Sequence, residues 1–295
     1  MLLLHNATHE TIWGGEKLCP YADTPGEKIG HLYTLCSEPG LETYIINGPY
    51  RGKTVQEYFD ENKDRLGLSA YKAFPFILAL VEAKDHLSIQ VHPDDKMAVE
   101  EENAEYGKNE SWIFLEAPKT GWIFNGCTVN TPTELRARID SGEALSAIDR
   151  LQIGKGDYVY VNAGTLHAMG AGSVVFEIEE NSPWTYRLYD YDRTDSLGRK
   201  RQLHLEKGLR ALNTSMKSIA RKMPTDWIEE RRYKVKQIRN ATTYQNNSQT
   251  IQCITVISGS ATGEEYVLQS GHTAILEPGE RLSGRLIQTF VVEPI

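Results

Sequence analysis

The stretch LSIQVHPDD, residues 87–95, has the alternation of a β-strand that ends at a proline. Its polar members Ser88, Gln90 and His92 are separated by apolar residues. Because successive side chains of a strand point to opposite faces, these three side chains share one face. The pattern therefore predicts a strand with one apolar face and one face that carries a hydroxyl, an amide and an imidazole.

The bulk composition is that of a folded protein. The chain has 295 residues, enough for one large domain or two modest ones, and 40% of them are hydrophobic. No apolar run approaches the roughly 18–20 residues of a membrane span. The amino-terminal MLLLHNATHE is too short for the core of a signal peptide and lacks its basic start. We therefore expect a cytoplasmic protein without a membrane partner.

The charge balance argues against a nucleic-acid partner. The net charge is −8, the isoelectric point is about 5.6, and only GRKRQLH, residues 198–204, is locally basic. A nucleic acid would require a basic surface. An anionic substrate would have to be held by a few local cations against an unfavourable overall field.

The remaining patterns predict a mainly β protein. Residues 1–50 carry turn signals without clear periodicity, and we expect irregular structure there. From residue 151 onward, short apolar stretches alternate with glycine-rich turns. The simplest organisation is a β-rich domain over residues 1–222, with a helical insertion at about 131–150, and a smaller β domain over residues 223–295. Helical spacing marks residues 54–67, 131–150 and 203–212, and strand patterns mark 74–83, 111–117 and 121–126.

Two further segments carry side chains that bind metals. Glu110 begins a predicted strand in GKNESW, residues 107–112, and His167 lies in the glycine-rich AGTLHAMGAG, residues 163–172. Together with Gln90 and His92 they offer an amide oxygen, two imidazoles and a carboxylate. That mixed set suits Zn²⁺ or another divalent first-row metal. It leaves coordination positions open, which favours a catalytic ion over a structural one.

Each of these features alone also has a structural explanation. A histidine before a proline can serve a turn, Glu110 can be a solvated charge at a strand start, and the glycines can be turn residues. Asp94 and Asp95 are better explained as N-capping residues of a helix in DDKMAVEEENAEY. The metal hypothesis depends on three segments that each supply a ligand type in a β context.

A set of motifs resembles the type I mannose-6-phosphate isomerases in their short bacterial form. The resemblance implies a cupin-type jelly-roll barrel with a helical insertion and a second, smaller C-terminal β-barrel domain. It covers nearly the first 215 residues, and the C-terminal part matches only loosely. The motifs occur in the family's order and are IWGG (12–15), QVHPDD (90–95), GKNE (107–110), GTLHAMGAG (164–172), EIEENSPWTYRLYDYDR (177–193) and RQLHLEKGL (201–209).

The resemblance also implies the chemistry. The family interconverts an aldose and a ketose phosphate, mannose 6-phosphate and fructose 6-phosphate, by moving a proton through an enediol. A zinc ion acts there as a Lewis acid. The expected partner is thus a small sugar phosphate, and the sequence does not specify an oligomeric state. The family's zinc ligands fall on Gln90, His92, Glu110 and His167.

Other family positions predict catalytic and substrate-binding residues. Arg187 matches the catalytic arginine, and its guanidinium suits an oxyanion or a phosphate. The alternative for Arg187 is a salt bridge to Asp190 or Asp192. Lys108 and Ser88 match positions implied in substrate or phosphate contact. Glu177 matches a carboxylate of the substrate pocket.

Three departures from the family pattern lie near the expected site. Ala79 stands where the family usually has a lysine, and Pro183 and Trp184 stand where NSDTTYR usually has an aspartate. A Gly-Glu-x-Trp pattern is usual near the N-terminus, whereas this chain has His31 and Tyr33 there. We expect His31 to replace a lost cation or base in contact with substrate. We expect Trp184 to cover a sugar ring.

Three alternative functions follow from these departures. One is an isomerase or epimerase that acts on a related sugar or sugar phosphate. Another is a metal-holding, sugar-binding cupin without turnover, against which the intact Lys108, Glu110 and Arg187 argue. The last is a metal-dependent oxygenase, because two histidines and one carboxylate also suit non-haem iron. The order of the surrounding motifs disfavours the oxygenase.

Overall fold

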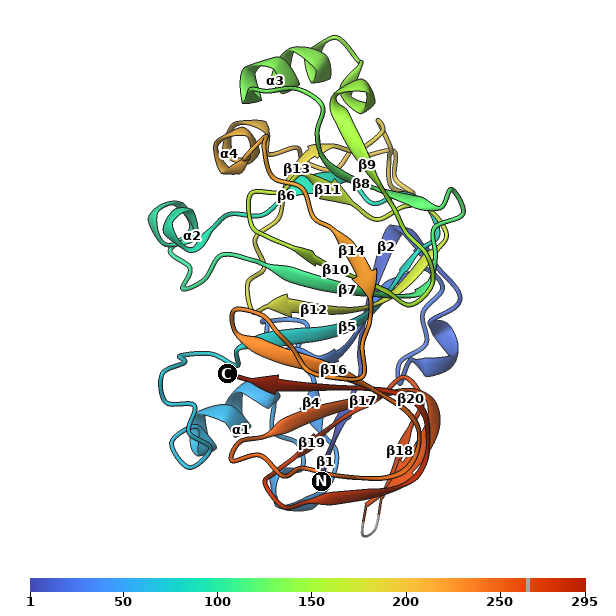
Figure 1. Ribbon diagram of the computed structural model, residues 1–295. Helices are drawn as coiled ribbons and strands as arrows, with labels where there is room; N and C mark the ends of the chain where they lie inside the picture. The colour runs from blue at the N-terminus through green and yellow to red at the C-terminus, as the bar shows by residue number, and fades with distance from the viewer. Residues whose placement is uncertain (264–265) are drawn as a thin grey trace.

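The protein is built from three antiparallel β-sheets, stacked as layers (Figure 1), in a computed structural model that describes residues 1–263 and 266–295. The prediction of a mainly β protein is confirmed. The middle layer has seven strands, in the order β14 (Ala220–Lys222), β10 (Asp157–Val161), β7 (Glu110–Glu116), β12 (Ser173–Glu180), β5 (Phe76–Ala83), β3 (Ile29–Leu35) and β2 (Ala7–Gly15).

The two outer layers differ in size. The smaller sheet has five strands, β13 (Tyr186–Tyr189), β6 (Ile89–Val91), β11 (His167–Ala168), β8 (Trp122–Cys127) and β9 (Ile148–Gln152). The larger sheet contains β15 (Ile228–Glu229), β16 (Tyr233–Gln245), β20 (Arg281–Pro294), β17 (Gln252–Thr262), β19 (Thr273–Leu276), β1 (Leu2–His5) and β4 (Tyr44–Ile45), and β18 (Val267–Gln269) pairs with β17.

The middle sheet is buried on both faces, which explains the continuous apolar run of β5. Leu78 and Leu80 belong to a core that the middle sheet shares with the larger sheet. Ile77 and Val81, which point the other way, belong to a core shared with the five-stranded sheet. All eight residues of β5 are buried. A strand with both faces covered has no solvent face and therefore no reason to alternate.

The helices lie at the edges of these layers and largely match the sequence prediction. α1 (Val55–Asn62) begins at the predicted position, with Thr54 and Glu57 forming a capping box, but ends before residue 67. α2 (Asp95–Glu102) is N-capped by Asp94, whose side chain accepts from the Met97 amide, as predicted. α4 is Leu205–Ala211, and short 3₁₀ turns lie at Cys19–Tyr21 and Gly48–Tyr50.

The helical segment predicted over residues 131–150 is shorter in the structure. α3 covers Pro132–Asp140, a 3₁₀ turn covers Ala144–Ala147, and β9 begins at Ile148. Gly142 has a positive φ of 77°, a conformation that a helix does not accommodate. The apolar residues after Gly142 belong to the 3₁₀ turn and to β9.

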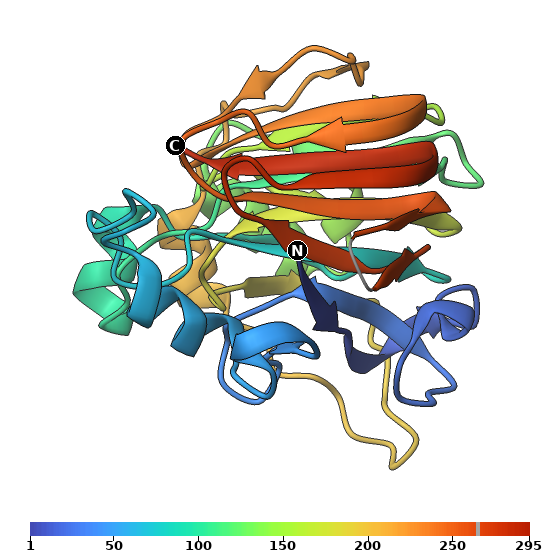
Figure 2. The same ribbon diagram turned by 90° about the horizontal axis from the view of Figure 1, so that it is seen from below.

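The expectation of irregular structure over residues 1–50 is wrong, because β1 to β4 lie there. β1 pairs with β19, with Leu2 opposite Ile275, so the N-terminal strand completes the sheet made mostly by the last part of the chain. In Figure 2 the N-terminus lies against this sheet. The division into domains at residues 222 and 223 stays a prediction. Among the described residues, no helix is long and apolar enough to cross a membrane.

A buried hydroxyl network connects the middle sheet with the larger sheet. The Ser111 hydroxyl lies 2.7 Å from the Tyr158 hydroxyl and 2.6 Å from that of Tyr233, a side chain with no exposed surface. Tyr158 in turn donates to Glu230. Such a network contributes to stability because its members have no access to water.

Removing one hydroxyl from this network should destabilise the fold. We expect Tyr233→Phe to lower the free energy of unfolding by about 1–2 kcal/mol, because Ser111 then loses a buried partner. Urea unfolding followed by tryptophan fluorescence measures this change. Tyr44→Phe, at a side chain that is 43% exposed, is the matched control and should leave stability unchanged. Equal stabilities of the two variants would contradict a contribution from the network.

Candidate metal centre and active site

The fold brings the four predicted metal ligands to one place between the five-stranded and the middle sheet. Gln90 lies in β6, His92 directly follows it, and His167 begins β11, where it is paired with Gln90. Glu110 begins β7 of the middle sheet. His92, Glu110 and His167 have at most 1% of their surface exposed. A chemically suitable group of three, His92, Glu110 and His167, is thus formed from both sheets.

Two glycines permit this convergence. The Gly107 amide donates to Asp95, and a Cβ added at Gly107 would lie 2.4 Å from the Pro93 carbonyl oxygen, so only glycine allows the segment before Glu110 to pack against the segment after His92. Gly164 has a φ of 85° and its amide donates to the His92 carbonyl. The glycines of the sequence motifs therefore serve close backbone approach.

Both histidines are oriented by backbone carbonyls. His92 Nδ1 lies 3.0 Å from the Trp184 carbonyl oxygen, and His167 Nδ1 lies 2.8 Å from that of Thr165. A neutral imidazole that donates through Nδ1 carries its lone pair on Nε2. Carbonyl partners of this kind commonly orient metal-binding histidines.

The inward-facing atoms of the three residues meet without hydrogen atoms between them. His92 Nε2 lies 3.1 Å from Glu110 Oε2, and His167 Nε2 lies 3.2 Å from Glu110 Oε1. His92 Nε2 and Glu110 Oε1 have no hydrogen-bond partner. Two lone-pair nitrogens and a carboxylate that face one another in a dry interior repel unless a cation lies between them. This arrangement suits a metal ion.

The ionisation of these groups agrees with ligand chemistry. Burial lowers the pKa of His92, more than the neighbouring Glu110 carboxylate raises it, and this favours the neutral ring. Burial opposes ionisation of Glu110, whereas positive charge on His92 and His167 would hold the pKa of that carboxyl well below its usual range; with both rings neutral, a bound cation would supply this charge. Neutral imidazoles and an ionised carboxylate are the forms that bind metals.

Gln90 lies beside this group. Its amide nitrogen is 3.4 Å from His167 Nε2, and its amide oxygen is 3.4 Å from the Ser88 hydroxyl. A half-turn of the terminal amide exchanges the two atoms and brings the oxygen toward His167. The residue is thus within reach of a bound ion, and its assignment as a fourth ligand stays a prediction.

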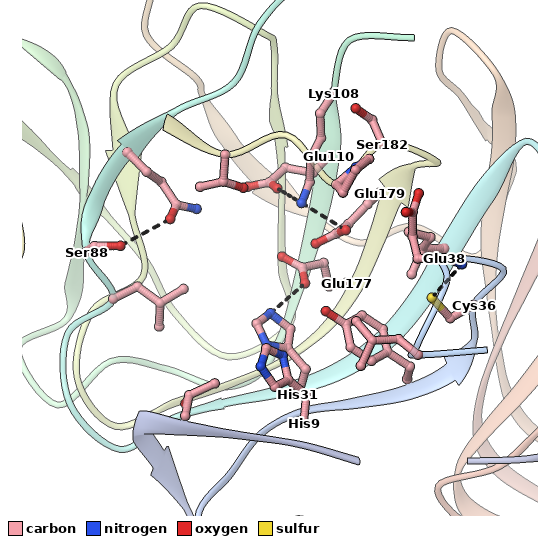
Figure 3. A pocket seen from close by; sticks show the side chains of 18 of the residues that line it. His9, His31, Cys36, Glu38, Ser88, Lys108, Glu110, Glu177, Glu179 and Ser182 are labelled. Atoms are coloured by element: carbon pink, nitrogen blue, oxygen red, sulfur yellow. Dashed lines mark hydrogen bonds and ion pairs between the residues drawn. The ribbon is translucent and has the colours of Figure 1, made fainter. Parts of the chain in front are cut away.

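The group of three opens into a cavity of about 400 Å³. Glu110 forms part of its wall, and Figure 3 shows polar side chains pointing into it from β3, β6, β7 and β12. Most of the predicted site residues line this cavity, namely Ser88, Gln90, Lys108, Glu110, Glu177, Arg187 and His31.

Lys108 lies between two carboxylates. Its Nζ is 2.9 Å from Glu179 Oε2 and 3.9 Å from Glu110 Oε2. Glu110 and Glu179 are directly opposite each other in the pairing of β7 with β12, a position in which like charges destabilise a sheet. Burial opposes the charge on Lys108, but Glu179 and Glu110 raise the pKa of its ammonium, which therefore stays charged.

Glu177 has one carboxyl oxygen without a hydrogen-bond partner. Trp112 Nε1 donates to its Oε1 at 2.7 Å, whereas Oε2 has no hydrogen-bond partner. Burial raises the pKa of Glu177, and the charges of Glu179 and Glu110 raise it further. Glu177 is 3% exposed. A carboxyl group of this kind can hold a proton near neutral pH.

Arg187 also lines the cavity and is paired with Gln90 in the sheet. Its Nε donates to Ser88 Oγ at 3.2 Å, and its Nη1 donates to the Gln202 carbonyl. No salt bridge from Arg187 to Asp190 forms, because Asp190 pairs with Arg193 and Arg201. The guanidinium is therefore available to a ligand.

Sequence reasoning missed a second arginine in the cavity wall. Arg201 lines the cavity with Arg187, and burial together with the charge of Arg201 lowers the pKa of Arg187. Arg201 belongs to the short basic segment of residues 198–204, which was the only available signal. Two guanidinium groups that line one cavity can bind an anion.

The structure places Trp184 outside this cavity. Its side chain lines a separate depression next to α4, together with Leu203 and Leu205, while its backbone carbonyl contacts His92. Pro183 and Thr185, on either side of Trp184, do line the cavity. The observed contact of Trp184 with the site is thus through its main chain.

Known proteins have sequences that are similar to this one. Residues 1–111 match the family described as phosphomannose isomerase type I, catalytic domain. The chain is 36% identical to the mannose-6-phosphate isomerase of Streptococcus mutans over 213 residues, which are 72% of this chain and 67% of that protein. It is also 36% identical to mannose-6-phosphate isomerase ManA of Bacillus subtilis over 204 residues, 69% of this chain and 65% of that one. The sequence alignments thus span about two thirds of these relatives' length.

Solved structures extend the similarity to the whole chain. The crystal structure of the mannose 6-phosphate isomerase from Bacillus subtilis is 31% identical and matches with a TM-score of 0.85, over 99% of this chain and 98% of that one. The chain belongs to the type I phosphomannose isomerase family. A variant of phosphomannose isomerase from Salmonella typhimurium, 14% identical with a TM-score of 0.72, shares the fold. The resemblance inferred from the motifs and the expected cupin-type fold are confirmed.

For a type I phosphomannose isomerase, this chain has an altered cavity wall. Ala79 lies between Tyr33 and Glu177 in the sheet register, and its methyl group cannot reach a substrate oxygen. The His/Glu/His group is intact. The change at position 79 therefore lies beside Glu177 and leaves the His/Glu/His group unaltered.

Removal of one imidazole should release the ion from this group. We expect His167→Ala to retain about one metal ion per chain fewer than the wild type after dialysis, because two ligands remain and Glu110 loses a neighbour. Elemental analysis of the dialysed protein measures this. His272→Ala, far along the chain in the larger sheet, is the control and should keep the wild-type content. Equal metal content in both variants would exclude His167 as a ligand.

Proposed function

We propose that this chain is a zinc-dependent mannose-6-phosphate isomerase, which interconverts mannose 6-phosphate and fructose 6-phosphate. The observation that carries the proposal is the convergence of the His92, Glu110 and His167 ligand atoms at the wall of a cavity that two arginines also line. Metal-binding and anion-binding groups that line one cavity match a substrate with a carbonyl end and a phosphate end. Family membership supports the same reaction.

Zinc is the proposed ion because of the donor set. Two imidazole nitrogens and a carboxylate oxygen, with the Gln90 amide as a fourth donor, are common zinc ligands, and an open position remains for substrate. When bound, the ion would polarise the sugar carbonyl and lower the energy of negative charge on its oxygen. His92, His167, Glu110 and Gln90 would hold it.

The remaining residues divide the reaction between them. Arg187 and Arg201 would bind the phosphate, with Ser88 holding the Arg187 guanidinium in place. The ammonium of Lys108 would donate to a substrate oxygen that gains negative charge. Glu177, whose Oε2 is free of hydrogen bonds, would take the proton from C2 of the aldose and return it to C1 of the enediol.

A related sugar phosphate is the second candidate substrate. Pro183 lines the cavity where the family usually has an aspartate, so a hydrogen-bond partner for a sugar hydroxyl is missing there. A site that has lost such a partner discriminates less strongly between sugars that differ in one hydroxyl group. A panel of aldose and ketose phosphates separates the two candidates.

Chelation should abolish turnover reversibly. We expect the purified protein to interconvert mannose 6-phosphate and fructose 6-phosphate at roughly 1 to 10³ s⁻¹. The activity should disappear with a chelator and return when Zn²⁺ is added. A coupled assay measures all three states. Protein that is loaded with zinc and converts no sugar phosphate would refute the proposed reaction.

Loss of one arginine should weaken phosphate binding. We expect Arg201→Gln to raise KM for the sugar phosphate about 10- to 100-fold, because a charge-assisted contact contributes about 1.5–3 kcal/mol. Steady-state kinetics measure this. Arg193→Gln is the matched control, since Arg193 also pairs with Asp190 but is not among the residues that line the cavity. The same KM in both variants would place the phosphate elsewhere.

A further inference from the structure

His31 is a cavity residue for which the proposed reaction has no assigned role. Its Nε2 lies 3.8 Å from Glu177 Oε2, and its Nδ1 is buried without a hydrogen-bond partner. Figure 3 shows the imidazole pointing from β3 toward the Glu177 carboxyl on β12. The oxygen that it faces is the Glu177 oxygen that lacks a hydrogen bond.

The sheet register explains how the two side chains can meet. β5 lies between β3 and β12, so His31 and Glu177 are two strands apart, or about 9–10 Å between backbones. Ala79 is the residue of β5 that is paired with Glu177. His31 is opposite Val81 and Tyr33 is opposite Ala79, so the imidazole reaches the Glu177 carboxyl diagonally, and the methyl group of Ala79 leaves that space open. A lysine at position 79 would occupy that space.

The ring of His31 is held firmly by its neighbours. It is stacked on Tyr33, with ring centres 5.4 Å apart and planes 2° apart, and the ring of His9, which also stacks on Tyr33, lies 5.9 Å from it. The edge of Trp13 lies 5.1 Å from it. Stacking of this kind restricts the rotation of a side chain. The direction in which Nε2 points is thus determined by packing.

The other charged groups near Glu177 do not occupy its free oxygen. Glu179 accepts from Lys108, Lys108 also faces Glu110, and Trp112 donates to the opposite oxygen of Glu177. His9 lies behind the His31 ring. Among the residues that the structure describes, His31 is thus the group placed to donate a hydrogen bond to Glu177 Oε2.

We propose that His31 is a positioning residue for Glu177: its neutral imidazole donates a hydrogen bond through Nε2 to the carboxylate and aims the free lone pairs of that carboxylate at substrate. The inference rests on the proposed function, in which Glu177 is the base. The separation of 3.8 Å closes to a hydrogen bond when substrate fills the cavity, since catalytic hydrogen bonds often tighten only in the complex. Burial lowers the pKa of His31 to about 3, which agrees with a neutral ring.

A neutral partner has a chemical consequence. A lysine beside Glu177 would form an ion pair, stabilise the carboxylate and weaken it as a base. A neutral imidazole orients the carboxylate with much less of this effect. The chain therefore replaces a charged partner with one that preserves the basicity of Glu177.

The test compares three substitutions of His31 in the zinc-loaded full chain. We expect His31→Phe, which keeps the stacking, to lower kcat about 10- to 100-fold with little change in KM, because the base is no longer aimed. His31→Gln retains an N–H donor and should recover most of kcat. In His31→Lys the acidic limb of the kcat–pH profile should move to lower pH, because a cation stabilises the Glu177 carboxylate. In His31→Phe that limb should move to higher pH.

The controls separate this role from folding and from metal binding. Circular dichroism shows whether each variant is folded. If His31→Phe does not fold, the comparison uses His31→Gln in its place. His272→Phe, the same exchange outside the cavity, should keep wild-type kcat. Zinc content is measured in parallel, because His31, Glu177 and Glu179 could also hold an ion. A second zinc ion in the wild type that His31→Phe loses would overturn the inference and make His31 a ligand.

Three other outcomes are decisive. Wild-type kcat and an unchanged pH profile in folded His31→Phe would overturn the inference while the proposed function stands. A loss of kcat in His31→Phe that His31→Gln does not restore would reduce His31 to a packing residue. A wild-type protein without turnover on any sugar phosphate would overturn the proposed function, and the inference with it.

Discussion

The burial of both faces of the seven-stranded middle sheet is the constraint on which the rest of this structure depends. One face is covered by the larger sheet, and the other by the five-stranded sheet. A strand in this position can carry a charged side chain only if a partner or a cavity receives it, since a buried unpaired charge is too costly. Glu177 and Glu179 of β12 and Glu110 of β7 are such side chains. These buried charges are accommodated because partners and a cavity lie between the two layers.

The polar groups of the site reduce the free-energy cost of burying one another. Lys108 offsets the repulsion between Glu110 and Glu179, which lie directly opposite each other on two adjacent strands. The histidines converge on Glu110 with their lone pairs, an arrangement that a cation stabilises. Glu177 retains one free oxygen. In a dry interior this matters, because a carboxyl oxygen without a hydrogen-bond partner is free to exchange a proton with a substrate.

Much of the site could be predicted from the sequence. The alternation in residues 87–92 showed that Gln90 and His92 share a face, and motif order identified the family and placed Glu110, His167 and Arg187. The Asp94 cap was predictable because N-capping depends on residues next to each other in the chain.

Other parts of the site could not be predicted. Arg201 lines the cavity because its salt bridge with Asp190 holds it there. Trp184 lines a separate depression outside the cavity. Both outcomes depend on contacts between segments that sequence patterns do not connect. The same holds for β1, which pairs with β19 at the opposite end of the chain and was expected to be irregular.

The sequence by itself determined the fold class, the family and the side chains of the candidate metal site, because these depend on periodicity and on motifs of adjacent residues. The tertiary structure alone decided which charged groups became partners. Ala79 illustrates the difference. In the sequence it is a missing lysine, whereas in the sheet it is the small residue beside Glu177 that leaves room for His31 to reach that carboxyl diagonally. That relation exists only because β3, β5 and β12 lie side by side, and strand order is set by long-range packing of the whole molecule.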